Sequence, residues 1–406
     1  MTAVLCRHFG LPHMEIAEDI ASDTFLKASE HWAVKGVPEN PTAWLYTVAK
    51  NKARDYCKHT SIFETQIKNN LRFDGPQHSN VIEFNERIIS DSQLAMIFAV
   101  CNPANSDENQ IALALQILCG FSVGEIANAF ISKTETIKKR LQRARGNLRN
   151  NDFQIKTLSK PDIRSRLETV LKTLYLLFNE GYFSKSNDQF IRKELCSEAL
   201  RLNLILTENP LTNTAQTNAL LALMCFQSSR IEARTNKNGE AVLFDEQDKG
   251  LWDTSLIERG NYYLANATNG KETSKYHLEA GIAYWHIIGG DDKWKKILQL
   301  YNQLVLIEYS PITALNRAFA FSKVYGHAGA IAEAEKLDLT ENSQYFELMG
   351  YLYAPLNGPK AVLHYQRAVK LTKSRTEKDT LKREIKRLKD ENNFRPEYQG
   401  TINRPD

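Results

Sequence analysis

The chain has 406 residues and a net charge of +4, with 25% charged and 42% hydrophobic residues. This length suffices for about two to four domains with ample cores, and the small net charge excludes a uniformly polycationic protein. No signal peptide and no apolar run of about 18 residues occur, which excludes a membrane span. The six cysteines are scattered without a CxxC pair, so we expect buried free thiols in a soluble cytoplasmic protein.

Nearly every segment shows helical periodicity, and alternation of β-branched residues is sparse, so the expected fold class is all-α. Changes in composition divide the chain into two small helical domains and a longer helical-repeat region. The expected parts are a compact helical domain at 1–62, a linker at 63–90, a second helical domain at 91–150, a helical extension at 163–270, helical repeats at 271–390 and a disordered tail at 391–406.

The first domain begins with an acidic amphipathic segment. Residues 15–30 hold five acidic side chains against one lysine, for a local charge of −4. Within Ala17–Ala28 the acidic and apolar residues fall on separate faces of a helix. A segment of this charge requires a partner other than nucleic acid.

The next segment, residues 40–55, combines aromatic rings with positive charge. Pro41 is a favourable first-turn residue, and Trp44 and Val48 share one helical face. Lys50, Asn51 and Arg54 supply cations and hydrogen-bonding groups beside the rings. This mixture suits single-stranded DNA, whose bases stack on rings while cations hold the phosphates.

Residues 121–148 predict two helices joined by a tight turn. In the second helix, Ile137, Leu141, Ala144 and Leu148 form one apolar stripe. Residues 133–149 carry seven basic side chains against one acidic side chain, for a local charge of +6. This is the geometry of a helix-turn-helix, which lays its second helix in the major groove. The simpler interpretation is a solvated basic helix in an ordinary helical domain.

From Ile163 onward, amphipathic helices follow one another. Three apolar triplets with i, i+4, i+7 spacing stand 33 and 31 residues apart, close to the 34-residue period of tetratricopeptide helix pairs. They are Ile297/Tyr301/Leu304, Ala330/Ala334/Leu337 and Ala361/Tyr365/Ala368. Simple amphipathic helices give the same spacing, so this pattern leaves both interpretations open.

Taken in order, residues 17–25, 40–55 and 125–148 resemble the motifs of bacterial sigma factors of the extracytoplasmic-function group, a branch of the sigma-70 family. The first two domains would correspond to the second and fourth conserved sigma regions. Residues 97–104, 176–182 and 245–253 resemble a subgroup with a tetratricopeptide-like C-terminal extension. Two departures are a first helix shortened by the start of the chain and Ser22, where the family more often has glutamine.

The resemblance implies promoter DNA and core RNA polymerase as partners, through the β′ clamp and the β subunit. It places Asp19, Asp23 and Phe25 against the clamp, and a regulatory protein on the C-terminal helices is a further expected partner. The expected −10 and melting residues are Trp44, Lys50, Asn51, Arg54 and Asp55, and the expected −35 residues are Thr134, Glu135, Lys138, Lys139, Arg140 and Arg143. The simpler interpretation of Trp44 and Phe25 is that both rings belong to the core.

No sequence motif of an enzyme is present. The chain lacks a P-loop, GxGxxG, HExxH and GxSxG, and its nine histidines lack metal-ligand spacing, so we expect no catalysis, no metal and no cofactor. Two other functions fit parts of the sequence: a helix-turn-helix regulator with a sensing C-terminal domain, and a helical-repeat scaffold that does not bind DNA. Both leave residues 40–55 unexplained.

Overall fold

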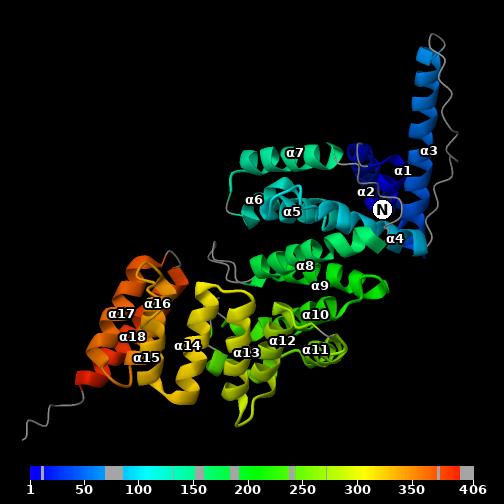
Figure 1. The fold of residues 1–406 in the computed structure, drawn as a ribbon. Coiled ribbons are helices and arrows are strands. Elements are labelled where there is room, and N and C mark those ends of the chain that lie inside the picture. Colours follow the sequence, from blue (N-terminus) through cyan, green and yellow to red (C-terminus); the bar gives the residue numbers. More distant parts are fainter. Residues whose placement is uncertain are drawn as a thin grey trace, which may run out of the picture. The chain divides into compact units, whose positions relative to one another are not determined.

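The computed structural model describes residues 1–10, 13–68, 86–130, 132–150, 160–182, 192–236, 242, 244–270, 272–372 and 375–393. These residues form helices and connecting loops, and no strand occurs among them, which confirms the expected all-α fold (Figure 1). None of the described helices is both long and apolar enough to span a membrane.

The chain divides into two compact units. Unit 1 contains Met1–Leu177 and Arg201–Thr212, and unit 2 contains Phe178–Leu200 and Asn213–Asp406. Helices α8 (Lys160–Tyr182) and α9 (Lys193–Glu208) contribute residues to both units. The C-terminal half therefore supplies part of unit 1 rather than beginning after it.

Unit 1 starts with three helices that pack in sequence order. These are α1 (Thr2–Phe9), α2 (Met14–Lys35) and α3 (Pro41–Lys68). Helix α4 (Glu86–Val100) packs against α1, and its residues 94–100 are all buried. The remaining elements are α5 (Asp107–Leu113), the π-helical turn η2 (Ala114–Leu118), α6 (Val123–Ala129) and α7 (Thr134–Asn150). The expected linker at 63–90 thus includes the end of α3 and the beginning of α4.

Unit 2 is a succession of helices in which neighbours pack against each other. Its elements are α10 (Ala215–Ser228), η3 (Ile231–Arg234), η4 (Phe244–Glu246), η5 (Lys249–Leu251), α11 (Thr254–Ala267), α12 (Lys275–Ile288), α13 (Lys293–Ile307), α14 (Pro311–Tyr325), α15 (His327–Glu335), α16 (Ser343–Tyr353), α17 (Gly358–Leu371) and α18 (Arg375–Asn393). Short polar side chains begin several of these helices: Ser310, Asn342 and Asn357 each accept a backbone N–H of the first turn. The first and third predicted triplets lie on α13 and α17, and Ala330 and Ala334 of the second lie on α15, whereas Leu337 follows the end of that helix. The alanines of the triplets are fully buried.

Candidate nucleic-acid interface

Helices α6 and α7 form the predicted helix-turn-helix. Ser122 and Glu125 begin α6 with a reciprocal cap, because the Glu125 carboxylate accepts the Ser122 N–H at 2.7 Å and the Ser122 hydroxyl accepts the Glu125 N–H at 3.2 Å. These hydrogen bonds lower the pKa of Glu125. The four residues of the α7 stripe, from Ile137 to Leu148, are all at most 4% exposed. Because α7 packs on α5 and α6 through this stripe, most of its polar residues face outward.

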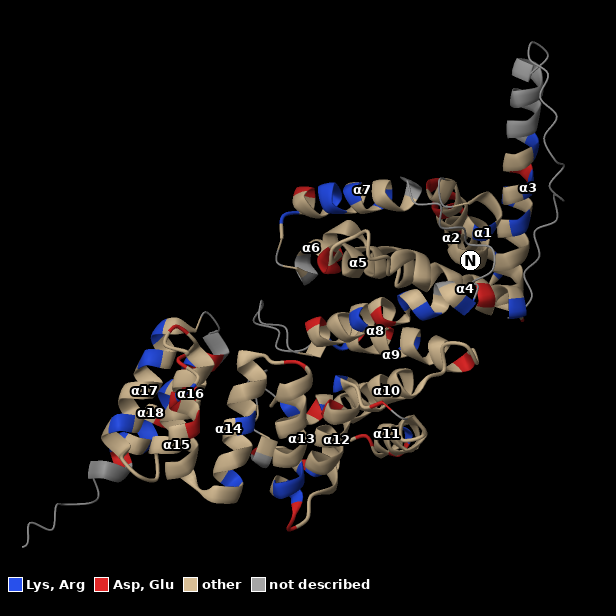
Figure 2. Ribbon diagram, in the orientation of Figure 1, with Lys and Arg blue, Asp and Glu red and all other residues tan. Residues whose placement is uncertain are grey.

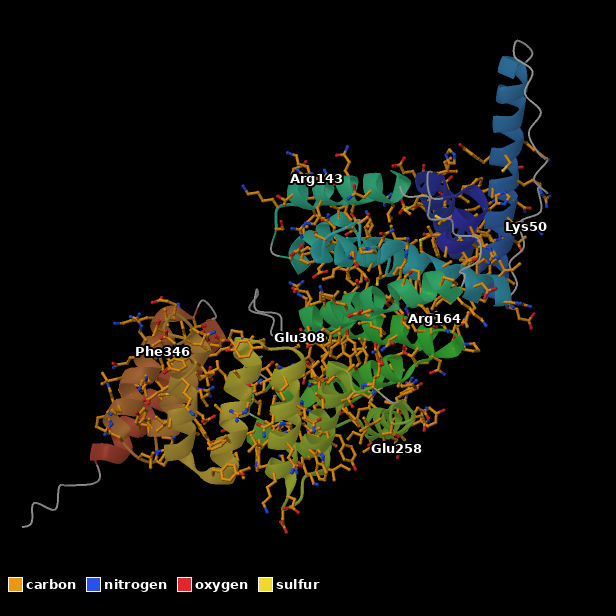
Figure 3. The ribbon with its side chains drawn as sticks, in the orientation of Figure 1. Lys50, Arg143, Arg164, Glu258, Glu308 and Phe346 are labelled. Atoms are coloured by element: carbon orange, nitrogen blue, oxygen red, sulfur yellow. The ribbon has the colours of Figure 1, made fainter. Side chains whose placement is uncertain are left out.

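The outward residues of α7 include five of the six predicted −35 residues. Thr134, Glu135, Lys138, Lys139 and Arg143 are exposed, and Arg140 is half-buried. Figure 2 shows the basic residues along α7, and Figure 3 shows the labelled Arg143 projecting away from the rest of the unit. The Arg140 guanidinium lies 5.6 Å from the centre of the Phe130 ring, which restrains it at the turn. Lys138 pairs with Glu135 at 2.8 Å, an exposed ion pair of little energetic weight.

Arg145 differs from the other basic residues of α7 because it turns inward. Its guanidinium donates one hydrogen bond to each oxygen of Glu18, both 2.8 Å long, and a third to Gln116 Oε1 at 2.9 Å. Glu18 belongs to α2, so this ion pair joins the basic helix to the acidic helix. Sequence reasoning missed the pair because the partners are 127 positions apart and no local pattern links them.

Helix α2 exposes its acids together with apolar side chains. Its core positions are Ala17, Ile20, Ala21, Thr24 and Ala28, which leaves Asp19 and Asp23 on the surface. Phe25 is 56% exposed and Leu26 is 60% exposed, so the expectation that Phe25 belongs to the core is wrong. Exposed rings beside exposed acids are typical of a protein-docking surface rather than of a DNA-binding one.

Helix α3 packs on α2 through Val48, Ala49 and Ala53, and it presents polar residues on its other side. Asn51, Arg54 and Asp55 are exposed, and Lys50, labelled in Figure 3, is half-buried. Asn40 caps the helix by accepting the Ala43 N–H at 3.0 Å. Lys52 pairs with Asp23 at 3.1 Å, so the predicted polymerase residues and the predicted −10 residues lie on adjoining helices.

Trp44 is half-buried, which fits neither a fully buried core residue nor a free ring. Its ring stacks on His31 at a centroid distance of 5.4 Å and lies 5.6 Å from Trp32. This aromatic cluster fixes the start of α3 against the end of α2.

A buried chain of hydrogen bonds connects α7 to the C-terminal half. Thr173 of α8 donates to Gln110 at 2.7 Å, Gln110 donates to the Asn105 carbonyl at 2.8 Å, and Asn105 donates to the Ala144 carbonyl at 3.3 Å. The three polar side chains are at most 3% exposed. Arg201 of α9 also donates to the Leu118 carbonyl at 3.0 Å. Helix α8 is therefore linked to α7 through buried side chains, and α9 is linked to the end of η2.

No group of histidine, cysteine, aspartate and glutamate that could hold a metal ion occurs within the described ranges. The candidate site consists of three surfaces of unit 1: the acidic and apolar surface of α2, the polar surface of α3 and the basic surface of α7.

Comparison with known proteins adds to this geometry. Residues 3–61 match the family model of sigma-70 region 2, and residues 166–268 match a family of unknown function, DUF6596. A protein of Rhizobium meliloti (strain 1021), described as uncharacterized protein R00370, is 30% identical over 394 residues, which cover 95% of this chain and 92% of that protein. No solved structure matches the chain.

Proposed function

We propose that this chain, which belongs to the same family as the Rhizobium meliloti protein R00370 and begins with a sigma-70 region 2, is a dissociable sigma factor of the extracytoplasmic-function group. It would bind core RNA polymerase in the cytoplasm and direct it to promoters. The observation that carries the proposal is the match of residues 3–61 to sigma-70 region 2, followed in the same compact unit by an outward-facing basic helix-turn-helix.

The first role is polymerase binding by α2. Asp19, Asp23 and Phe25 would contact the β′ clamp, and the domain of α7 would contact the β subunit. The exposure of all three α2 side chains supports this role. The Phe25 ring is in contact with water in the free chain, and its burial in an interface would be favourable.

The second role is recognition and opening of the −10 element by α3. Asn51, Arg54 and Asp55 are accessible for contacts with bases and phosphates, and Lys50 adds charge nearby. Trp44, whose ring lies next to this surface, would also take part in recognition of the −10 element. Capturing an unstacked base needs such groups, since unstacking costs a few kcal/mol.

The third role is −35 recognition by α7, through Thr134, Glu135, Lys138, Lys139, Arg140 and Arg143. The exposed lysines and Arg143 suit phosphates and base edges, whereas Glu135 suits a cytosine amino group. Arg145 has no part in this surface, because its guanidinium is bound to Glu18 and Gln116.

The fourth role belongs to the C-terminal half, which we propose to be required for activity because it braces α7. The buried hydrogen bonds from Thr173 and the bond from Arg201 support this direction. The tetratricopeptide-like character of 271–390, and a regulatory protein bound there, are parts of the same proposal. They are supported by paired helices whose small residues are buried.

We also propose that the chain is not an enzyme. Burial raises the pKa of the Cys6, Cys101 and Cys196 thiols to about 12, so these sulfurs stay protonated and are poor nucleophiles at neutral pH.

Run-off transcription with purified core polymerase of the same organism tests the proposal. A sigma factor yields promoter-specific transcripts when it is the sole specificity factor added. A helix-turn-helix regulator binds DNA without starting transcripts on core enzyme, and a scaffold does neither, so the assay separates the three functions. Core polymerase that stays inactive on every promoter fragment, while a known sigma factor activates it, would refute the proposal.

A further inference from the structure

Unit 2 contains a cavity of about 1000 Å³ that none of the proposed roles uses. Helices α14, α16, α17 and α18 form its walls, and Phe244 of η4 lies at one end. Most of the lining is apolar, including Leu315, Phe319, Leu348 and Leu381. The volume lies at the upper end of the range for small-molecule sites, which are mostly apolar with a few polar groups that fix the orientation of the ligand.

Three of the charged groups in this cavity already have partners within the protein. The Lys323 ammonium lies 5.6, 5.1 and 5.4 Å from the ring centres of Trp294, Phe319 and Tyr351. Arg387 and Glu384 form an ion pair of 2.8 Å. The rings stabilise the ammonium of Lys323, and Arg387 and Glu384 balance each other's charge, so none of the three depends on a ligand.

The remaining carboxylates of the lining are Glu246 of η4 and, on α16 next to the apolar Leu348, Glu347. Its side chain lines the cavity and is accessible to solvent there, and among the described residues it has no ion pair and no hydrogen bond to its carboxyl group. The charge that acts on it is that of another acid, Glu377. A carboxylate in these surroundings is available to an incoming cation.

The surrounding protein supports this assignment. Desolvation by the cavity walls and, to a lesser degree, the charge of Glu377 raise the pKa of Glu347 to about 7. Burial and the nearby charges of Glu384 and Glu347 likewise raise the pKa of Tyr365, which remains a neutral phenol. Because Glu347 remains exposed to solvent at the cavity, a cation bound beside it would act by favouring the charged form of the carboxylate.

The Tyr365 ring owes its place to a glycine. A Cβ atom at Gly350 would lie 2.6 Å from the ring, so only glycine lets the two helices hold it there. Tyr365 thus lines the cavity that contains Glu347, and aromatic faces attract organic cations.

We propose that this cavity binds an apolar or aromatic molecule that carries one ammonium or guanidinium group, with Glu347 as the countercharge. The cation could belong to a free small molecule or to a lysine or arginine side chain of a peptide. The proposal concerns binding alone and is independent of the transcriptional role.

The test measures fluorescence anisotropy of dansylcadaverine, which joins an aromatic ring system to an ammonium, on the full-length chain at pH 8. Its matched neutral analogue is N-butyl dansylamide. The cationic probe should bind about tenfold more tightly, and Glu347→Gln should abolish this preference while leaving the neutral probe unaffected. Glu341→Gln, a control outside the cavity on the preceding loop, should retain the preference. Ile312→Trp, which fills the cavity, should weaken both probes.

The pH dependence provides a second readout. From pH 8 to pH 6 the affinity for the cationic probe should fall, because Glu347 takes up a proton, and that for the neutral probe should not. Other charged or titratable groups line this cavity, namely Glu246, Lys323, His327, Tyr351, Tyr365, Glu384 and Arg387, and the charge of Glu377 also acts on Glu347. The loss of affinity at low pH must therefore disappear in Glu347→Gln. A pH effect of equal size in that variant would overturn the assignment.

A labelled peptide shows whether the bound cation belongs to a peptide side chain or to a free small molecule. Tighter binding of the dansyl-labelled peptide Phe-Leu-Lys than of its norleucine analogue, with an affinity above that of dansylcadaverine, assigns the cation to a peptide side chain. The reverse order assigns it to a small molecule. Equal affinity of the cationic and neutral probes, or no saturable binding of dansylcadaverine to the wild-type chain, would overturn the proposal.

Discussion

Arg145 of α7 and Glu18 of α2 form a bidentate ion pair whose side chains are only 15% and 27% exposed. Through it, the helix assigned to the −35 element is tied to the helix assigned to the polymerase. A cavity of about 330 Å³ beside the pair is lined by Glu15, Gln116 and Gln142, among others. Because its side chains are only 15% and 27% exposed, the pair is partly shielded from solvent, and its loss should be measurable.

Removing one partner of this pair should destabilise unit 1. In Glu18→Gln, the charge that compensates Arg145 is lost, and we expect the free energy of unfolding to fall by about 1–2 kcal/mol. Urea unfolding measures the change. Asp19→Asn removes an exposed acid one position away and should stay within about 0.5 kcal/mol of the wild type. Equal effects of the two substitutions would show that the pair contributes nothing specific.

Replacement of the outward arginines of α7 should weaken duplex DNA binding. For Arg140→Ala with Arg143→Ala, each lost phosphate contact should lower the salt slope by about 0.9, and a lost base contact should cost about 1–3 kcal/mol at one position. Of the single variants, Arg143→Ala should have the larger effect because Arg140 packs on Phe130. The control combines Arg367→Ala with Arg383→Ala, two exposed arginines of α17 and α18. The assignment fails if DNA affinity and salt slope match those of this control.

Phe25 should matter for polymerase binding but not for stability. Because its ring is 56% exposed, Phe25→Ala should leave the free energy of unfolding within about 0.5 kcal/mol, yet weaken binding to core polymerase by about 2 kcal/mol if the ring is an anchor of the interface. Surface plasmon resonance with immobilised core enzyme measures this affinity. Tyr262→Ala, which removes a ring 63% exposed in unit 2, is the matched control. Unchanged affinity in the Phe25 variant would remove this residue from the interface.

The hydrogen-bond chain from α8 should contribute to the order of α7. Thr173→Val leaves the Gln110 side-chain oxygen without its buried donor, which should cost about 1–3 kcal/mol and increase amide exchange in α5 and α7. This substitution is a sharper test than truncation near Asp152, which would also remove the buried Val170, Leu171 and Leu174. Thr268→Val removes an exposed hydroxyl bonded to the Ala265 carbonyl and serves as control. Wild-type exchange rates in α7 of the Thr173 variant would contradict the bracing role.

His286 should make unit 2 sensitive to acid. Burial, with Lys293 and Arg230 nearby, lowers the pKa of this imidazole to about 3. The unfolded chain takes up a proton near pH 6.5 and the folded chain does not, so stability should decrease as the pH falls below 6.5, by about 2 kcal/mol at pH 5. His286→Phe should remove this part of the pH dependence in urea unfolding, whereas His31→Phe should retain it. A steep loss between pH 6.5 and pH 5 that persists in His286→Phe would assign the sensitivity to other groups.

Local patterns predicted much of the fold. The period of Ile137, Leu141, Ala144 and Leu148 identified the buried face of α7, and all four residues are in the core. The same reasoning applied to α2 predicts that Phe25 lies on the surface, because the inward positions are already occupied by Ala17, Ala21, Thr24 and Ala28. The aromatic character of Phe25 suggested that it would be buried, but its position in the helical period places it on the exposed face of α2.

Contacts between distant segments could not be predicted in this way. The pair Arg145–Glu18 and the bond from Thr173 to Gln110 depend on how helices far apart in sequence pack. The cavity at Glu347 depends likewise on the spacing of four helices, and Glu347 itself occupies an ordinary helical position. The roles of the DNA and polymerase residues remain predictions.

The link from Thr173 to α7, and the bond from Arg201 to η2, have a consequence for synthesis of the protein. The ribosome completes α7 well before it reaches either residue, and domains begin to fold while the chain emerges. A nascent chain halted after α7 would present a basic helix without its support from α8 and α9. With α7 as the proposed −35 helix, finished molecules would then bind DNA differently from interrupted ones.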